Sequence, residues 1–208
     1  MDGPTLYLTR HGQTIWQADN RFAGSSEVDL DEHGREQADL LADWAKGARL
    51  TELWCSDLRR ARDTAAAVAG ATGLTPRIDA RLRELHFGRS EGRTIPEMRL
   101  DYPERVDAFE ADPVAGYLPE GEDPREATER GLAALHEIMA GAGPEGRVLV
   151  VCHSTLLRLV LCQLMGIELG AYRRLFPFVR NCGLTQVALG PGGPALLEYN
   201  TPLDGSWW

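Results

Sequence analysis

Residues 148–154, Val-Leu-Val-Val-Cys-His-Ser, contain the pattern that decides the fold. The four residues at 148–151 are apolar and mostly β-branched, which is typical of a central strand buried on both faces. A helix is expected directly afterwards, from about Thr155 to Met165. His153 lies between the two, and a buried imidazole at such a junction needs polar partners. We therefore expect a parallel sheet with polar residues gathered at the carboxyl end of this strand.

The rest of the chain alternates short apolar runs with longer segments of helical period. This alternation predicts an α/β fold, a three-layer α/β/α sandwich around a mostly parallel central sheet. Two apolar runs near the carboxyl end, separated by Gly and Pro residues, predict a terminal hairpin at a sheet edge. The expected strands lie at 6–8, 53–55, around 78, at 186–189 and at 196–199; the expected helices lie at 31–47 and 58–68 and begin again at Thr94 and Asp123.

Length and composition restrict the class of protein. The chain has 208 residues, 43% of them hydrophobic and 25% charged, which suits one soluble domain with one core. Its formal net charge of −9 makes nonspecific binding to nucleic acid or to an anionic membrane a poor expectation. An anionic substrate would therefore need positive charge concentrated in a pocket.

No targeting segment is recognisable. Residues 1–5, Met-Asp-Gly-Pro-Thr, lack the basic start of a signal peptide, and no run approaches the roughly 20 apolar residues of a membrane span. The four cysteines lack the Cys-x-x-Cys spacing of redox or zinc motifs, so we expect buried thiols. These features predict a cytoplasmic protein.

Polar segments follow three of the expected strands. Arg10-His11-Gly12 follows the first, a segment containing Arg60 follows the second, and His153 follows the central one. In open α/β sheets, ligands bind outside the carboxyl ends of the strands, so these side chains should converge. Arginine forks match phosphate oxygens, and the free N–H groups of the helix after His153 would face the same anion. A fourth segment, around Glu84, could add a carboxyl group.

This set of residue types fits phosphoryl transfer. Neutral imidazole can attack phosphorus and form a covalent intermediate, and the remaining work is positioning and charge stabilisation. Arg10, Arg60 and a protonated His153 could supply that positive charge. Glu84 could protonate the leaving oxygen and then deprotonate the attacking water.

Six segments then carry a resemblance to a known family. Residues 8–14 (LTRHGQT) and 150–154 (VVCHS) surround the two histidines, 56–65 (SDLRRARDTA) holds Arg60, and 82–92 (LRELHFGRSEG) holds Glu84. Residues 20–24 (NRFAG) and 28–34 (VDLDEHG) complete the series. Over about 6–189 the sequence resembles the histidine phosphatase superfamily, also called phosphoglycerate mutase-like, with these motifs in the family's order.

The resemblance implies the roles of individual residues and a reaction without metal or other cofactor. It implies that His11 is the nucleophile, that Glu84 is the acid and base, and that Arg10, Arg60 and His153 are catalytic residues of the phosphate pocket. Two positions depart from the usual pattern: Gln17 replaces asparagine and Ser154 replaces glycine. The residues expected to bind substrate are Arg10, Gln17, Phe22, Gly24, Arg60 and Ser154.

The resemblance also implies a single domain over 1–208 with a small helical cap inserted at about 93–122. The stretch between Glu84 and His153 is compact, whereas mutases of the family carry a longer insertion there, so a phosphatase is favoured. A phosphoglycerate-type mutase and a non-catalytic phosphate-binding domain stay open as alternatives. A metal-dependent hydrolase using residues 29, 31 and 33 is disfavoured, since Asp31 suits a helix start better.

The expected partner is a small phosphate ester whose identity the sequence does not select, and the protein is expected to be a monomer or homodimer. A second anionic group of the substrate could meet cap arginines, and an apolar wall could come from nearby aromatic residues. The arginine candidates are Arg83, Arg89, Arg93 and Arg99; the aromatic ones are Trp16, Phe22 and Phe87. Trp207 and Trp208 could pack over the domain or form an oligomer contact.

Overall fold

The computed structural model describes residues 3–205, and its centre is a six-stranded sheet of order β3-β2-β4-β1-β5-β6. Strands β3, β2, β4 and β1 are parallel, while β5 pairs antiparallel with β1 and with β6. The strands are β1 (Thr5–Arg10), β2 (Glu52–Cys55), β3 (Arg77–Ile78), β4 (Arg147–Cys152), β5 (Leu184–Gly190) and β6 (Gly193–Thr201). This sheet confirms the predicted fold class and the hairpin at the edge.

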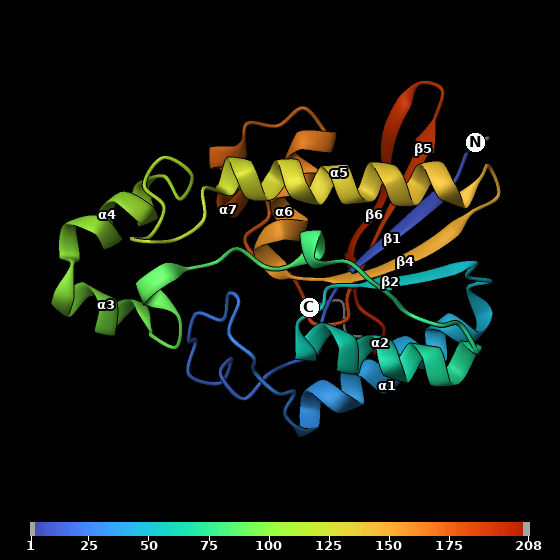
Figure 1. The fold of residues 1–208 in the computed structure, drawn as a ribbon, viewed down its shortest axis with the longest axis horizontal. Coiled ribbons are helices and arrows are strands. Elements are labelled where there is room, and N and C mark those ends of the chain that lie inside the picture. The colour runs from blue at the N-terminus through green and yellow to red at the C-terminus, as the bar shows by residue number, and fades with distance from the viewer. Residues whose placement is uncertain (1–2, 206–208) are drawn as a thin grey trace.

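Helices cover both faces of the sheet. In Figure 1, α1 and α2 lie below the strands and α5 lies above them, and α6 packs on the same side as α5. The helices are α1 (Glu32–Gly47), α2 (Arg59–Thr72), α3 (Ile95–Asp101), α4 (Pro103–Ala111), α5 (Pro124–Ala142), α6 (Ser154–Leu164) and α7 (Tyr172–Leu175), with short 3-10 helices at Ala80–Leu82, Gly88–Ser90 and Leu169–Ala171.

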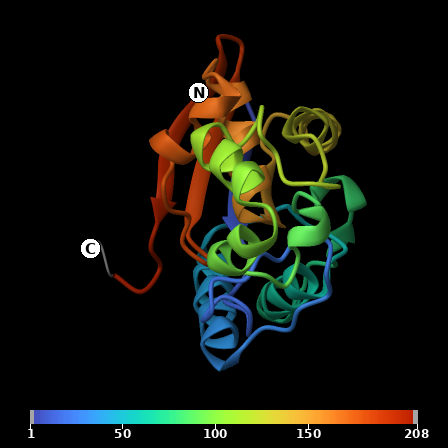
Figure 2. The same ribbon diagram turned by 90° about the vertical axis from the view of Figure 1, so that its left-hand side faces the viewer.

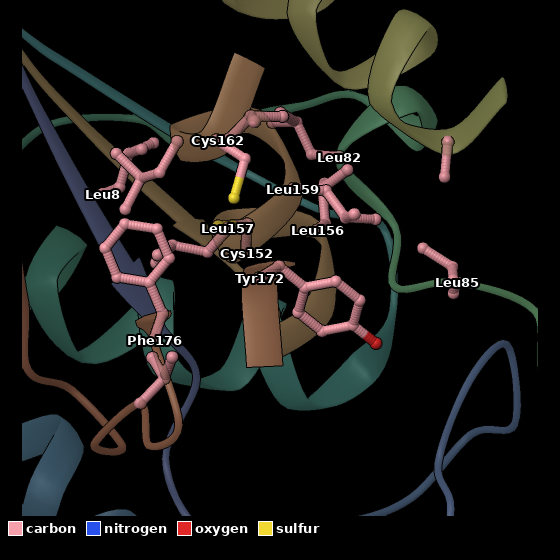
Figure 3. Packing of buried hydrophobic residues seen from close by; sticks show 14 of the residues in the cluster. Leu8, Leu82, Leu85, Cys152, Leu156, Leu157, Leu159, Cys162, Tyr172 and Phe176 are labelled. Carbon is pink, nitrogen blue, oxygen red and sulfur yellow. The ribbon is translucent and has the colours of Figure 1, made fainter. Parts of the chain in front are cut away.

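The two-residue period of the strands divides the core into two layers. Leu6 and Leu8 of β1 join one buried cluster, and Tyr7 between them joins the other, because successive side chains point to opposite faces. The side chains of β4 alternate between the two clusters in the same way. Both faces of this strand are therefore buried, which is why its apolar run is continuous. Figure 3 shows the first layer, where Leu8, Leu157 of α6 and Tyr172 of α7 lie together.

Local capping chemistry sets several helix ends. Asp31 accepts a hydrogen bond from the Gly34 N–H at 2.7 Å and begins α1, which confirms the predicted helix start. Thr94 and Glu97 form a reciprocal capping box at the start of α3. Helix α2 ends at Gly73, whose φ of 75° belongs to the left-handed region that glycine adopts readily.

Three features differ from the sequence expectation. The helices α4 and α7 were not predicted, since α7 has only four residues and α4 follows α3 after the single residue Tyr102. The edge strands are longer than expected, because Gly190 pairs with Gly193 and leaves a two-residue turn.

The carboxyl ends of β1 and β4 point towards the side of the molecule that holds α3 and α4 (Figures 1 and 2). Both helices fall inside the segment predicted as a cap, and the division into one domain with a cap stays a prediction. All four cysteines are buried and unpaired, as expected. Within residues 3–205 no helix is long and apolar enough to cross a membrane. Trp207 and Trp208 lie outside the described residues.

Candidate active site

His11 follows the last residue of β1, and its ring is held in one tautomer. Its Nδ1 lies 2.7 Å from the carbonyl oxygen of Gly12, which can only accept, so Nδ1 carries the hydrogen. The neutral ring therefore keeps its lone pair on Nε2, which accepts a hydrogen bond from Arg60 Nε at 3.2 Å. The side chain is 5% exposed. The reactive nitrogen of this imidazole thus faces an arginine inside the protein.

Close backbone packing fixes the loop after β1. The Gly12 N–H donates to Thr64 Oγ1 of α2 at 3.0 Å. A Cβ on Gly12 would lie 2.3 Å from the carbonyl oxygen of Gly34, so a larger residue cannot fit without moving α1. The loop carrying His11 is therefore held between α1 and α2.

Arg60, in the first turn of α2, is completely buried and bonds only neutral acceptors. Its terminal nitrogens donate to the carbonyl oxygens of Ser26 at 2.9 Å, Ala23 at 3.1 Å and Gly24 at 2.7 Å. Gly24, predicted to bind substrate, thus contacts the guanidinium of Arg60. The partly buried carboxylate of Glu91 accepts hydrogen bonds from the N–H groups of residues 25 and 26 and holds this loop.

His153 precedes α6 as its N-cap residue and faces His11, with the two ring centroids 5.1 Å apart. It is fully buried, yet neither ring nitrogen has a hydrogen-bond partner. Arg10 Nε is the only other buried side-chain nitrogen or oxygen in the described part of the chain without a partner. Because buried polar atoms are nearly always paired, these three nitrogens mark a position suited to a polar ligand.

Arg10 is aligned by two amide side chains. Its Nη2 donates to Gln17 Oε1 at 3.1 Å and its Nη1 donates to the carbonyl oxygen of Val179. Gln17 Nε2 in turn donates to Asn181 Oδ1 at 2.8 Å, and Asn181 Nδ2 donates to the carbonyl oxygen of His11. The longer side chain at position 17 therefore still reaches Arg10. Sequence reasoning missed Asn181, which lies in no recognisable pattern.

The carboxylate of Glu84 occupies the N-terminus of α6. It accepts hydrogen bonds from the N–H groups of Thr155 at 2.9 Å and Leu156 at 3.0 Å, and from that of Leu85. We expected these helical N–H groups to be free for phosphate, and for these two that expectation is wrong. A buried carboxylate needs donors, and the helix N-terminus supplies them. Glu84 is consequently fixed beside the histidine pair.

Arg130 of α5 holds the segment that carries Glu84. Its guanidinium donates to the carbonyl oxygens of Arg81, Arg83 and Glu84 at 2.7 to 3.2 Å. Its remaining contacts are hydrogen bonds to both carboxylate oxygens of Glu122. Position 130 was not singled out in the sequence, because an arginine on an amphipathic helix usually faces solvent.

Burial controls the charge states at the site. The pKa of His11 lies well below its ordinary value because of burial, with further lowering by Arg60 and Arg10. The pKa of His153 is lowered in the same way, so the ligand-free site favours the neutral ring, and the protonated His153 expected during phosphoryl transfer stays a prediction. Burial also lowers the pKa of Arg10 to about 10, which leaves it charged at neutral pH. The site therefore combines neutral imidazoles with charged guanidinium groups.

These residues border a pocket of about 350 Å³. Arg10, His11, Gln17, Glu84 and Ser154 line it, together with Phe22 and Phe87, whose rings pack edge to face at 5.0 Å. Trp16 and the four predicted cap arginines are absent from the lining. A larger hollow of about 500 Å³ beside α5 has no histidine in its lining, so size alone does not locate the chemistry.

Three further arginines line the same pocket and were missed: Arg21, which pairs with Glu97, Arg158 of α6 and Arg173 of α7. Arg158 could have been found, since it lies one helical turn after Ser154 and shares its face of the helix. Arg173 belongs to a helix too short to predict. Positive charge is thus concentrated in one pocket. An anion-binding site on a chain of negative net charge was expected to need this concentration.

The chain is similar to known proteins over most of its length. Residues 6–202 match the family described as histidine phosphatase superfamily (branch 1). A relative called probable phosphoglycerate mutase GpmB, from Yersinia pestis (strain Pestoides F), is 39% identical over 189 residues, which are 88% of this chain and 83% of that protein. Two solved structures are also similar.

The first is a mycobacterial glucosyl-3-phosphoglycerate phosphatase in complex with VO3, with a TM-score of 0.86, 28% identity, and coverage of 95% of this chain and 99% of that one. The second is a putative α-ribazole-5′-P phosphatase from Escherichia coli K-12, with a TM-score of 0.85, 26% identity, and coverage of 96% and 97%. Similarity therefore extends over nearly the whole fold, and the relatives' names divide between mutase and phosphatase.

Proposed function

The chain belongs to branch 1 of the histidine phosphatase superfamily, and we propose that it hydrolyses a small phosphorylated metabolite through a phosphohistidine on His11. The observation that supports this most directly is the tautomer of His11. Its Nδ1–H is engaged with the Gly12 carbonyl, and the Nε2 lone pair faces Arg60 and the pocket. An imidazole kept neutral and oriented in this way is a nucleophile that needs no separate base.

In the first step, His11 Nε2 attacks phosphorus and a P–N bond forms. The bond between phosphorus and the ester oxygen breaks, and that oxygen leaves with the bonding electrons and takes a proton from the Glu84 carboxyl group. Arg10, Arg60 and His153 surround the position where the phosphoryl oxygens lie and stabilise their charge. The Gly12 carbonyl keeps the Nδ1 proton and stabilises the positive phosphohistidine ring.

In the second step, water attacks the phosphorus of phosphohistidine. The water gives a proton to the Glu84 carboxylate, the P–Nε2 bond breaks, and its electrons return to His11. Inorganic phosphate leaves, and both residues are again in their starting states. A phosphate dianion beside His153 favours its protonated form, which offsets the lowering of its pKa by burial.

The name of the 39% identical relative gives a second candidate, a mutase that returns the phosphoryl group to the organic product. The two functions share the phosphohistidine and differ in its acceptor. The names of the two similar structures support hydrolysis. The short cap also supports it, since α3 and α4 together span only 95–111.

The test is a product assay with 3-phosphoglycerate and p-nitrophenyl phosphate in the presence of EDTA. A phosphatase releases inorganic phosphate from an ester and forms no 2-phosphoglycerate. His11→Asn should abolish turnover, while His33→Asn should not, because His33 is exposed on α1 and pairs with Glu36. Conversion of 3- to 2-phosphoglycerate without phosphate release would establish the mutase instead. Loss of activity on chelation would contradict the metal-independent mechanism.

A further inference from the structure

The cap and loop arginines first expected to bind a second anionic group are already paired with acids. Arg83 binds Asp57, Arg93 binds Asp101 at 2.6 Å, and Arg99 binds two carboxylates of α4. Arg89 lies 3.9 Å from Glu120. Each of these arginines is matched by one or two carboxylates, so none of these groups offers a net positive charge to a ligand. Any second anion site has to come from arginines without an acidic partner.

Arg158 is such an arginine. It is 8% exposed, and it donates Nε to the Ser154 carbonyl at 3.1 Å and Nη1 to the Phe176 carbonyl at 3.3 Å. Its guanidinium lies 4.8 Å from the centre of the Tyr172 ring. No hydrogen bond from Nη2 and no salt bridge is formed within residues 3–205. The charge of Arg158 is therefore held rigidly at the pocket and is not neutralised.

Arg173 lies beside it in the pocket lining. Its guanidinium stacks 4.3 Å from the ring centre of Phe109 in α4, and Nε donates to Tyr172 Oη at 3.3 Å. Tyr172 is almost fully buried in the core cluster of Figure 3, which anchors the short helix α7. Arg173 also forms no salt bridge with any described residue. Two fixed, unneutralised guanidinium groups thus share one side of the pocket.

We infer that Arg158 and Arg173 form a second anion subsite, which selects phosphomonoesters carrying a further carboxylate or phosphate group. The inference rests on the proposed function, because the first phosphate has to lie at His11. Glu84 is the one acidic residue in the pocket lining, and its carboxylate is bound to backbone N–H groups. Glu84 acts on Arg158 only through space, and no carboxylate of the lining forms a salt bridge with either arginine.

The spacing limits the size of the substrate. Arg158 lies one turn beyond Ser154 on α6, and its Nε reaches back to within 3.1 Å of the Ser154 carbonyl oxygen. Ser154 adjoins His153 and the phosphate position. A second anionic group at Arg158 therefore lies close to the first phosphate, which suits a compact molecule whose two anionic groups are a few bonds apart. Phe22 and Phe87 line the same pocket.

The experiment compares matched esters. 3-Phosphoglycerate and glycerol 3-phosphate differ only by a carboxylate in place of a hydroxymethyl group, and fructose 1,6-bisphosphate and fructose 6-phosphate differ by a second phosphate. In at least one pair, kcat/KM should favour the doubly anionic ester by roughly tenfold or more, as for a charge-assisted hydrogen bond. The pair that shows the preference identifies the second group as carboxylate or phosphate.

Arg173→Met and Arg158→Lys should each reduce that preference severalfold, with a larger effect for methionine. Arg174→Met is the matched control, because Arg174 is the exposed neighbour on α7 and is absent from the pocket lining. Equal kcat/KM within both pairs, or a preference unchanged in both variants, would overturn the subsite. If p-nitrophenyl phosphate is not hydrolysed at all, the proposed function fails. Calorimetric binding of the same four esters to wild type and variants then decides on the subsite.

Discussion

Two sets of arginines in this protein differ in what they bind. Arg83, Arg93 and Arg99 form salt bridges with nearby carboxylates, whereas Arg10, Arg60 and Arg158 donate only to carbonyl, amide or imidazole acceptors. The pKa of each paired arginine is raised, chiefly by the hydrogen bond to its acidic partner. The pKa of each pocket arginine is lowered, chiefly by burial.

This difference shows where an anion can bind. Exposed salt bridges contribute about 0 to 1 kcal/mol and leave little field beyond the pair. A buried guanidinium bonded to neutral acceptors keeps its full charge in a region of low dielectric constant. The net charge of −9 is therefore compatible with a strongly positive pocket. Whether an arginine can bind an anion therefore depends mainly on whether a carboxylate lies beside its guanidinium.

Among the variants that test this comparison, the largest loss of activity is expected at Arg60. Arg60→Gln should lower kcat for p-nitrophenyl phosphate by about 10² to 10³, as for loss of a preorganised oxyanion donor. Arg99→Gln is the control from the paired group and should change kcat/KM by less than about twofold. Circular dichroism should confirm that both variants fold. Similar losses in the two variants would mean that pairing with carboxylates does not separate the groups.

A smaller effect is expected from Glu84, the acidic member of the pocket lining. Glu84→Gln should slow an alkyl phosphate by about 10² or more, since an alkoxide needs a proton to leave. Hydrolysis of p-nitrophenyl phosphate should fall much less, because nitrophenolate leaves without one. Equal slowing of both esters would count against Glu84 as the proton donor.

Arg130 tests how Glu84 is positioned. Arg130→Met removes the donors to the carbonyl oxygens of residues 81, 83 and 84, and should slow alkyl phosphates roughly tenfold through misplacement of the carboxyl group. The aryl ester should be affected less, a split that simple destabilisation does not produce. Arg125→Met, on the same helix but in an exposed pair with Asp123, is the matched control. A uniform loss on both esters would assign Arg130 a structural role only.

The buried histidines predict how stability depends on pH. The pKa of His11 and of His153 is lower in the folded chain than the ordinary 6.5 expected after unfolding. Below pH 6.5 the unfolded chain takes up protons that the folded chain does not, so the free energy of unfolding falls as pH falls. Above that pH the two histidines cause no loss. Each should contribute about 1.4 kcal/mol per pH unit.

Urea unfolding of wild type and His153→Gln across pH 5 to 8 measures this slope. The variant should lose stability less steeply below pH 6.5 than wild type. The exposed His33→Gln should keep the wild-type slope. A slope unchanged by His153→Gln would mean that His153 is protonated in the folded protein.

The histidine end of the pocket could be predicted because it is carried by sequence-local features. Arg10 is the last residue of β1, His11 and His153 directly follow two neighbouring strands, and Arg60 lies in the first turn of the helix after a third. Strand period and helix caps therefore determine their placement, and the structure brings all four together. The family motifs added the position of Glu84.

The other end of the pocket could not be predicted, since it depends on tertiary packing. Arg173 lies on a four-residue helix held by one buried tyrosine, and it stacks on Phe109 of a helix far away in sequence. The sequence favoured Arg83, Arg93 and Arg99 because they lie near the cap. It did not reveal the carboxylates that neutralise them, which become neighbours only in the folded chain.

The most direct test of the central claim is to trap the phosphorylated protein. Wild type mixed with p-nitrophenyl phosphate in EDTA and quenched in alkali, which preserves phosphohistidine, is analysed by intact and peptide mass spectrometry beside His11→Asn. We expect one added phosphoryl group on His11 in wild type and none in the variant. Turnover of the ester with phosphate on another residue, or undiminished turnover by His11→Asn, would contradict it.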